Sequence, residues 1–194
     1  MKPLNALLVV SLITSLLYGC AAAVVGGAAT GATAVHDRRT VGTFIDDEGI
    51  ELKARLAIFN DRELNSQIHI NIISVNGVVL LVGQAPTEAA RLKAAEIVST
   101  VPKVRLIHNE MTVAAPNSYM TRSSDALITA KVKAQLFSIK GHPDFDPTRV
   151  KVVTENGVVY LMGILKHTEA DTVTNEARQV GGVQKVVKLF EYID

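Results

Sequence analysis

The sequence is poor in the residues that covalent scaffolds and many binding sites require. Its 194 residues include one cysteine and no tryptophan, and only 5% are aromatic. A single cysteine excludes an internal disulfide framework and any metal site built from several cysteines. The 20 Lys and Arg residues nearly balance the 19 Asp and Glu residues, so the net charge of +1 creates no overall field that would attract nucleic acid. We therefore expect no nucleic-acid partner.

The N-terminal residues have the pattern of a targeting signal. Lys2 is followed by twelve mostly apolar residues, Ala6 to Leu17, fewer than the roughly 20 that a helix needs to cross a bilayer. Residues 1–19 are therefore predicted to be a signal peptide. The stretch Leu17-Tyr18-Gly19-Cys20 resembles the bacterial lipobox. This resemblance implies that the Cys20 thiol is diacylglycerylated, that the chain is cut before it, and that a fatty acid such as palmitate caps the new amino group.

Lipid on Cys20 would determine where the protein works. Each buried methylene contributes ~0.8 kcal/mol and one fatty chain anchors only reversibly, so three chains should hold the protein durably. Ala21 follows, and in lipoproteins of this type the lack of Asp there implies export to the periplasmic face of the outer membrane. Residues 20–45 are rich in Ala, Val, Gly and Thr and are interpreted as the lipidated Cys and a flexible tether. The Gly27 to Gly31 spacing would also suit a helix-packing face.

The rest of the chain is an internal duplication. A shift of 80 residues aligns Asn76-Gly77-Val78-Val79 with Asn156-Gly157-Val158-Val159, and a shift of 78 aligns Phe59 with Phe137. The duplication predicts two domains, one at residues 46–113 and one at 124–194, joined by a linker at residues 114–123.

Each copy has the same predicted order of elements. In the first copy we expect a helix near 50–59, a strand near 68–72, a type I′ turn at Asn76-Gly77, a strand at 78–82, a helix at 87–100 and a strand at 104–113. In the second copy the helices are expected at 125–139 and 168–180, and the strands at 149–154, 158–162 and 184–193. The predicted fold class is α+β, with two tandem αββαβ domains, each a three-stranded sheet with two helices on one face.

The hairpin pattern Asn-Gly-x-Val-x-Leu-x-Gly, found at 76–83 and 156–163, resembles the BON domain. Together with the lipobox and the tether, it resembles outer-membrane lipoproteins with two BON domains. That resemblance implies a protein that binds anionic phospholipid, phosphatidylglycerol or cardiolipin, through the first helix of its second domain. It also implies concentration at the division site and support of outer-membrane integrity. The family often has a tryptophan near the start of that helix, where this sequence has Leu127.

The residues of that predicted helix carry two apolar stripes, and a helix that covers a sheet needs only one. Ile128, Val132 and Leu136 form the predicted core stripe. The second stripe is flanked by cations, a composition typical of a helix in the headgroup region of a membrane. The predicted lipid-binding residues are Arg122, Leu127, Ala130, Lys131, Lys133, Ala134 and Phe137. Alternatively the second stripe is architectural or packs the two domains together, since the first copy has Leu52, Leu56 and Phe59 at comparable positions.

Catalytic motifs are not evident. The sequence has no G-x-S-x-G elbow, P-loop or G-x-G-x-x-G, and its five histidines lack the spacing that places two metal ligands on one helix. We interpret His142 to Pro147 as a turn rather than a metal site, and Asp46-Asp47-Glu48 as a helix N-terminal cap. No catalytic residue, metal or cofactor is predicted. The alternative to lipid binding is a periplasmic adaptor that binds an envelope assembly component or a cell-wall enzyme.

Overall fold

The structure is a computed structural model that describes residues 38–139 and 145–193. Residues 36–194 form one compact unit. The predictions for the signal peptide, for Cys20, for most of the tether and for His142 lie outside the described residues. None of the described helices is both long enough and apolar enough to cross a membrane.

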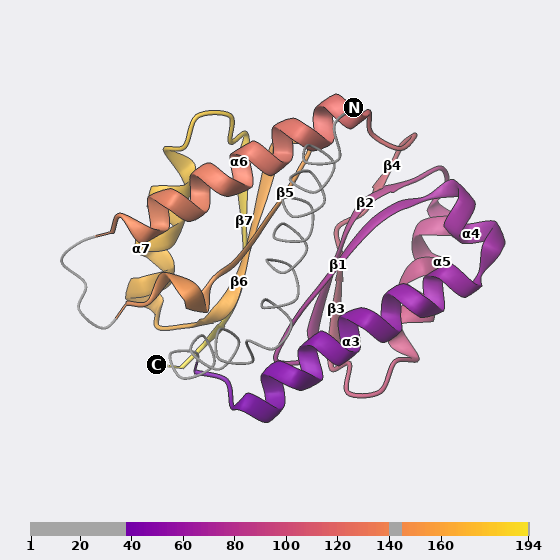
Figure 1. Ribbon diagram of the computed structural model, residues 1–194, viewed down its shortest axis with the longest axis horizontal. Helices are drawn as coiled ribbons and strands as arrows, with labels where there is room; N and C mark the ends of the chain where they lie inside the picture. The colour runs from indigo at the N-terminus through magenta and orange to yellow at the C-terminus, as the bar shows by residue number, and fades with distance from the viewer. Residues whose placement is uncertain (1–37, 140–144, 194) are drawn as a thin grey trace, which may run out of the picture. The chain divides into compact units, whose positions relative to one another are not determined.

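The first domain contains a long helix, an antiparallel hairpin, a second helix and a returning strand (Figure 1). Strand β2 pairs antiparallel with β1 and parallel with β3 and β4. Asn76 and Gly77 have φ angles of 52° and 72°, which agrees with the predicted type I′ turn. The elements are α3 (Val41–Asn60), α4 (Arg62–Gln67), β1 (His69–Val75), β2 (Val78–Ala85), α5 (Glu88–Ser99), β3 (Leu106–Asn109) and β4 (Thr112–Val113).

The second domain repeats this order. Strand β6 pairs antiparallel with β5 and parallel with β7. The predicted αββαβ order is therefore confirmed in both copies, and the short helix α4 is an addition to the first. The elements are α6 (Tyr119–Phe137), the 3₁₀ turn η1 (Pro147–Arg149), β5 (Lys151–Glu155), β6 (Val158–Leu165), α7 (His167–Arg178) and β7 (Lys185–Tyr192).

The two sheets pack against each other, with the helices of each domain on the outer side of its own sheet (Figure 1). Every residue of β2 is buried, because one face of the strand meets α3 and α5 while the other meets the second sheet. The contact between the sheets is apolar. Its buried members are Ile73, Val75, Val78, Leu80, Val82, Tyr160 and Met162.

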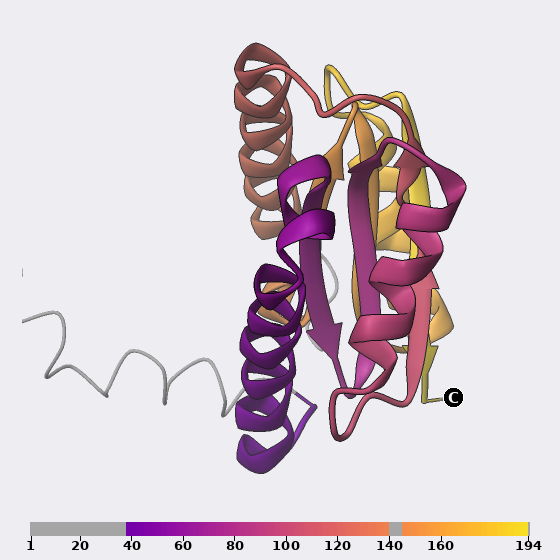
Figure 2. The same cartoon turned by 90° about the vertical axis from the view of Figure 1, so that its right-hand side faces the viewer.

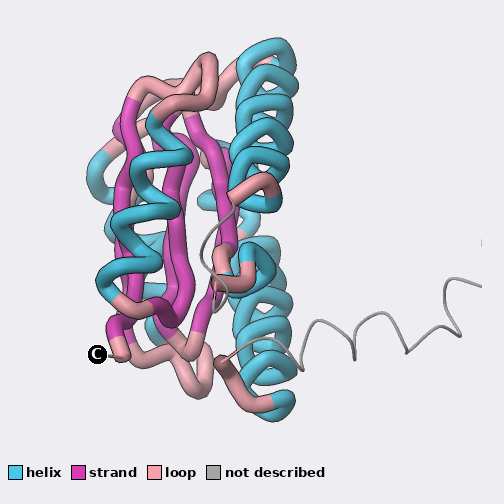
Figure 3. The backbone as a smooth tube through the Cα atoms, turned by 90° about the vertical axis from the view of Figure 1, so that its left-hand side faces the viewer, coloured by secondary structure: helices cyan, strands magenta, loops and turns pink. Residues whose placement is uncertain are grey.

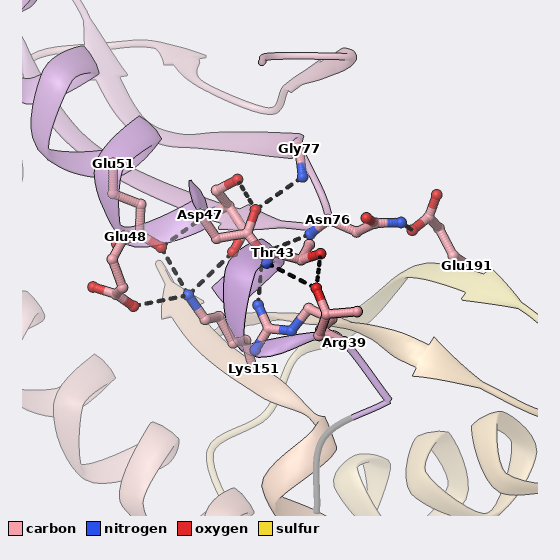
Figure 4. Close-up of polar contacts among 11 residues, drawn as sticks. Arg39, Thr43, Asp47, Glu48, Glu51, Asn76, Gly77, Lys151 and Glu191 are labelled. Carbon is pink, nitrogen blue, oxygen red and sulfur yellow. Dashed lines mark hydrogen bonds and ion pairs between the residues drawn. The ribbon is translucent and has the colours of Figure 1, made fainter. Parts of the chain in front are cut away.

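Polar contacts join the domains at the edges of this apolar layer. The Lys151 ammonium group lies 2.8 Å from Glu51 and 3.6 Å from Glu48, so a cation of the second domain is held by two acids of α3 (Figure 4). Elsewhere the Gln84 amide donates to Glu155 at 2.6 Å. All three core clusters and these contacts lie within the described residues. A fragment of residues 36–194 therefore keeps the three core clusters and the interdomain contacts described above.

Both long helices begin earlier than predicted. Helix α3 starts at Val41, inside the segment predicted as tether, and α6 starts at Tyr119, inside the predicted linker. Thr40 and Ser118 are the N-caps, and their hydroxyls accept from the backbone N–H three residues later. The interpretation of Asp46-Asp47-Glu48 as a cap is therefore wrong. Asp47 occupies a core position within the helix. This acid interrupts the apolar pattern, so the pattern alone did not identify the first turns of α3.

Candidate lipid-binding surface

Helix α6 carries its two apolar stripes on different sides. Ile128, Val132 and Leu136 are buried under the sheet, with exposed fractions of 6%, 0% and 2%. Leu127 and Phe137 are 63% and 65% exposed. The remaining predicted residues Ala130, Lys131, Lys133 and Ala134 are also exposed, and Arg122 is half-buried. We call the set Leu127, Ala130, Lys131, Lys133, Ala134 and Phe137 the α6 outer face.

The first turn of α6 extends this exposed apolar surface. Tyr119 and Met120 are 86% and 82% exposed. The guanidinium group of Arg122 lies over the Tyr119 ring at 5.4 Å from its centroid, within the range of a cation–π contact. Sequence reasoning missed Tyr119 and Met120 because it began the helix at residue 125. The signal that identifies the true start is Ser118, an N-cap residue whose hydroxyl also contacts the Thr121 hydroxyl at 2.9 Å.

The orientation of α6 is fixed from its buried side. Both oxygens of Asp125 accept backbone N–H groups of the second hairpin turn, from Asn156 and from Gly157, each at 2.9 Å. The Thr129 hydroxyl donates to Thr154 at 2.8 Å, on the neighbouring strand β5. These contacts lock the rotation of the helix about its axis. The α6 outer face is therefore held away from the protein interior.

Helix α3 exposes a comparable stripe in the first domain. Leu52, Leu56 and Phe59 are 58%, 50% and 65% exposed and belong to none of the core clusters. The alternative that such stripes pack the two domains together is therefore wrong, because strand residues form that contact. Helices α3 and α6 each cover the outer face of their own sheet, and both lie toward the same edge of the paired sheets (Figures 2 and 3).

The buried carboxylate of α6 has a counterpart in α3. Asp47 accepts from Ser74 Oγ at 2.6 Å, Asn76 N at 2.7 Å and Gly77 N at 2.8 Å, and it pairs with Arg39 at 2.7 Å (Figure 4). Burial alone would raise the pKa of Asp47, but these hydrogen bonds hold it below its ordinary value of 3.8. The role of this carboxylate is structural, since it attaches the long helix to the Asn-Gly turn.

Among the residues that the structure describes, no group of three His, Cys, Asp or Glu side chains could hold a metal ion. In the loop interpreted as a turn, Asp146 caps η1 by accepting from the Thr148 N–H at 2.8 Å and from its hydroxyl at 2.7 Å. This part of the loop has the geometry expected of a turn.

Comparison with known proteins identifies the family. Residues 46–115 and 124–194 match the family model described as BON domain. The chain belongs to the BON domain family and contains two BON domains. It is 37% identical to the outer membrane lipoprotein DolP of Haemophilus influenzae over 194 residues, which cover 100% of this chain and 99% of the relative.

Two further relatives are similar over shorter stretches. The 21 kDa hemolysin of Actinobacillus pleuropneumoniae is 36% identical over 157 residues, which cover 81% of this chain and 79% of the relative. The osmotically-inducible protein Y of Escherichia coli K12 is 29% identical over 150 residues, with coverages of 75% and 72%. None of these names is that of an enzyme. The similarities support an outer membrane lipoprotein of the BON family.

Proposed function

We propose that this protein is a non-enzymatic lipoprotein that binds anionic phospholipid at the periplasmic face of the outer membrane through the α6 outer face. Lipid on Cys20 anchors the chain. Binding of phosphatidylglycerol or cardiolipin then holds the second BON domain against the membrane, and the protein supports outer-membrane integrity at the division site. The full-length similarity to an outer membrane lipoprotein supports the envelope location.

One observation carries the lipid-binding step. The helix that needs a single buried stripe also exposes Leu127 and Phe137 to solvent, at 63% and 65%, and places Lys131 and Lys133 between them in the sequence. Exposed apolar side chains beside ammonium groups suit the headgroup region, where the apolar part is buried and the cations lie near phosphate. Cations near an anionic leaflet contribute about 1 kcal/mol each, and salt screens them.

The proposal is tested with residues 36–194, which lack the lipid anchor. This fragment should co-sediment with phosphatidylglycerol vesicles, less so at high salt, and should not bind phosphatidylcholine vesicles. Leu127→Glu should abolish the binding, because it places a carboxylate at the centre of the apolar contact. The matched control is Leu92→Glu, because Leu92 is a similarly exposed leucine at 55% but lies on α5 of the first domain.

The adaptor hypothesis makes the opposite prediction for this experiment. If wild-type protein and Leu127→Glu co-sediment with the vesicles equally well, or if neither does, the α6 outer face does not bind lipid. Recovery of an envelope protein partner that is lost in Leu127→Glu would then assign this surface to an adaptor function. Urea unfolding of each variant shows whether the substitution has changed the fold instead.

A further inference from the structure

A groove of about 420 Å³ is lined by residues of both α3 and α6. Residues of β1 and β5 also line it, so both BON domains contribute. We call this cavity the interdomain groove. Its polar lining includes Arg55, His69, Asn71, Arg122, Asp125 and Glu155.

Arg122 is the residue of the groove whose hydrogen bonding is incomplete. Its Nε is buried and has no hydrogen-bond partner. Within residues 38–139 and 145–193 its guanidinium group forms no ion pair. Its charge instead makes a cation–π contact with the Tyr119 ring. A buried donor without an acceptor destabilises a folded protein, so such donors are rare unless a ligand or water completes them.

Neither acid that lines the groove, Asp125 or Glu155, forms an ion pair with Arg122 within the residues that the structure describes. The oxygens of Asp125 accept the backbone N–H groups of the second hairpin turn, as described above. Oε1 of Glu155 accepts from Gln84 at 2.6 Å and from Asn117 at 2.9 Å. The other oxygen of Glu155 lies 3.9 Å from His69 Nε2. Both carboxylates therefore contact other groups, and the Arg122 donors remain available.

A second guanidinium group faces the groove from the other domain. Arg55 on α3 uses its Nη2 to contact Glu51 at 3.0 Å and the Ile72 carbonyl at 3.3 Å, and its side chain is 60% exposed. Its remaining N–H donors form no hydrogen bond within the part of the chain that the structure describes. Burial and the charge of Arg122 lower the pKa of His69, which keeps this imidazole neutral at neutral pH. The permanently charged donors that line the groove thus belong to the guanidinium groups of Arg122 and Arg55.

We propose that the interdomain groove binds a phosphate group, with Arg122 and Arg55 donating to its oxygens from the two domains. Guanidinium groups match phosphate geometrically because two parallel N–H donors meet two oxygens. The groove has room for a phosphate together with a glycerol unit. The phosphate can come from a phospholipid headgroup or from a free phosphate ester. The headgroup form rests on the proposed function, whereas the free form does not.

The test uses residues 36–194 with two kinds of probe. The soluble probe is sn-glycerol 3-phosphate, and its binding is followed through the Nε–Hε signals of the arginines in NMR spectra. The membrane probe is a phosphatidylglycerol vesicle, with phosphatidylcholine as the neutral reference. We expect Arg122→Gln and Arg55→Gln each to weaken binding of the soluble probe at least tenfold. Arg122→Lys should restore binding only in part, because it keeps the charge but loses the planar donors.

The matched control is Arg178→Gln, because Arg178 is exposed on α7 and does not line the groove. Equal affinity of wild type and Arg122→Gln for sn-glycerol 3-phosphate overturns the proposal, and so does absence of binding to wild type in both arms.

If Arg122→Gln also weakens vesicle binding, the phosphate is a headgroup. If the substitution affects only the soluble probe, the phosphate is a free ester. Leu127→Glu separates the two proposals, since it should abolish vesicle binding but leave glycerol phosphate binding unchanged. Urea midpoints confirm that each variant is folded.

Discussion

Replacing Asp47 with alanine tests how the long helix of the first domain is attached to its sheet. The carboxylate is 1% exposed and accepts from two backbone N–H groups and the Ser74 hydroxyl while it pairs with Arg39. Alanine leaves the two backbone N–H groups and the Ser74 hydroxyl without this acceptor in a buried environment. Breaking a buried, hydrogen-bonded charge by removing one partner costs about 3–5 kcal/mol. We expect Asp47→Ala to lower the free energy of unfolding by about this amount.

The neighbouring residue provides the control. Asp46 lies on the same helix and pairs with Lys103 at 2.6 Å, but the side chains are 41% and 64% exposed. Exposed ion pairs contribute about 0–1 kcal/mol, so Asp46→Ala should have a small effect. Urea unfolding of residues 36–194, followed by circular dichroism, measures both. If the two acids only interacted with the helix dipole, both alanine variants would lose the same small amount, and our explanation would be refuted.

The Asp47 carboxylate should also affect how the free energy of unfolding changes at acidic pH. Because the folded-state pKa of Asp47 lies below its ordinary 3.8, the folded protein holds the ionised form more strongly than the unfolded chain does. Its contribution is complete above that ordinary value and is lost as the pH falls through the lower folded-state pKa. We expect Asp47→Asn to flatten this acid limb in urea unfolding series below about pH 4. An unchanged acid limb would show that Asp47 is not the group responsible.

Four further variants test backbone conformation, packing and the α6 outer face. Gly83→Ala should destabilise the protein by about 1–3 kcal/mol in urea unfolding, because Gly83 has a φ of 131° and a Cβ would overlap the carbonyl oxygen of His69 on β1. Gly49→Ala has open space on α3 and should instead stabilise by about 0.5–1 kcal/mol. Leu80→Ala removes a fully buried side chain between the sheets and should cost about 2–5 kcal/mol, with both domains still unfolding in one transition. The double variant Lys131→Gln/Lys133→Gln should bind phosphatidylglycerol vesicles about 30-fold more weakly, as two cations near the leaflet contribute about 1 kcal/mol each. An unchanged vesicle affinity would contradict this role for the lysines.

The order of elements was predictable because each element has a local signature. The two Asn-Gly turns mark both hairpins, and Thr87 is the N-cap of α5, accepting from the Ala90 N–H at 3.1 Å. The starts of α3 and α6 were not predictable from apolar spacing, because Asp47 and Asp125 occupy core positions on them. In the sequence, an acid at a core position breaks the apolar pattern that marks a helix. Only the structure shows that this acid binds the backbone of the Asn-Gly turn.

The pairing of the two domains also had a signal that sequence reasoning did not use. The segment Val78 to Val82 is apolar at every position, as expected of a strand buried on both faces, whereas a strand with one solvent face alternates. This run indicates that something covers the second face of the sheet. It does not say what covers it, because any apolar surface would satisfy the same residues.

By itself, the sequence determined the duplication, the αββαβ order and the presence of a surplus apolar stripe with cations on α6, since all of these depend on neighbours along the chain. Only the tertiary structure decided that the surplus stripe stays exposed while the strands join the domains. It alone placed Arg55 and Arg122 in one groove, because they lie on helices of different domains, 67 positions apart (122 minus 55) in the sequence. Such proximity depends on the packing of one sheet against the other, and no local pattern records it.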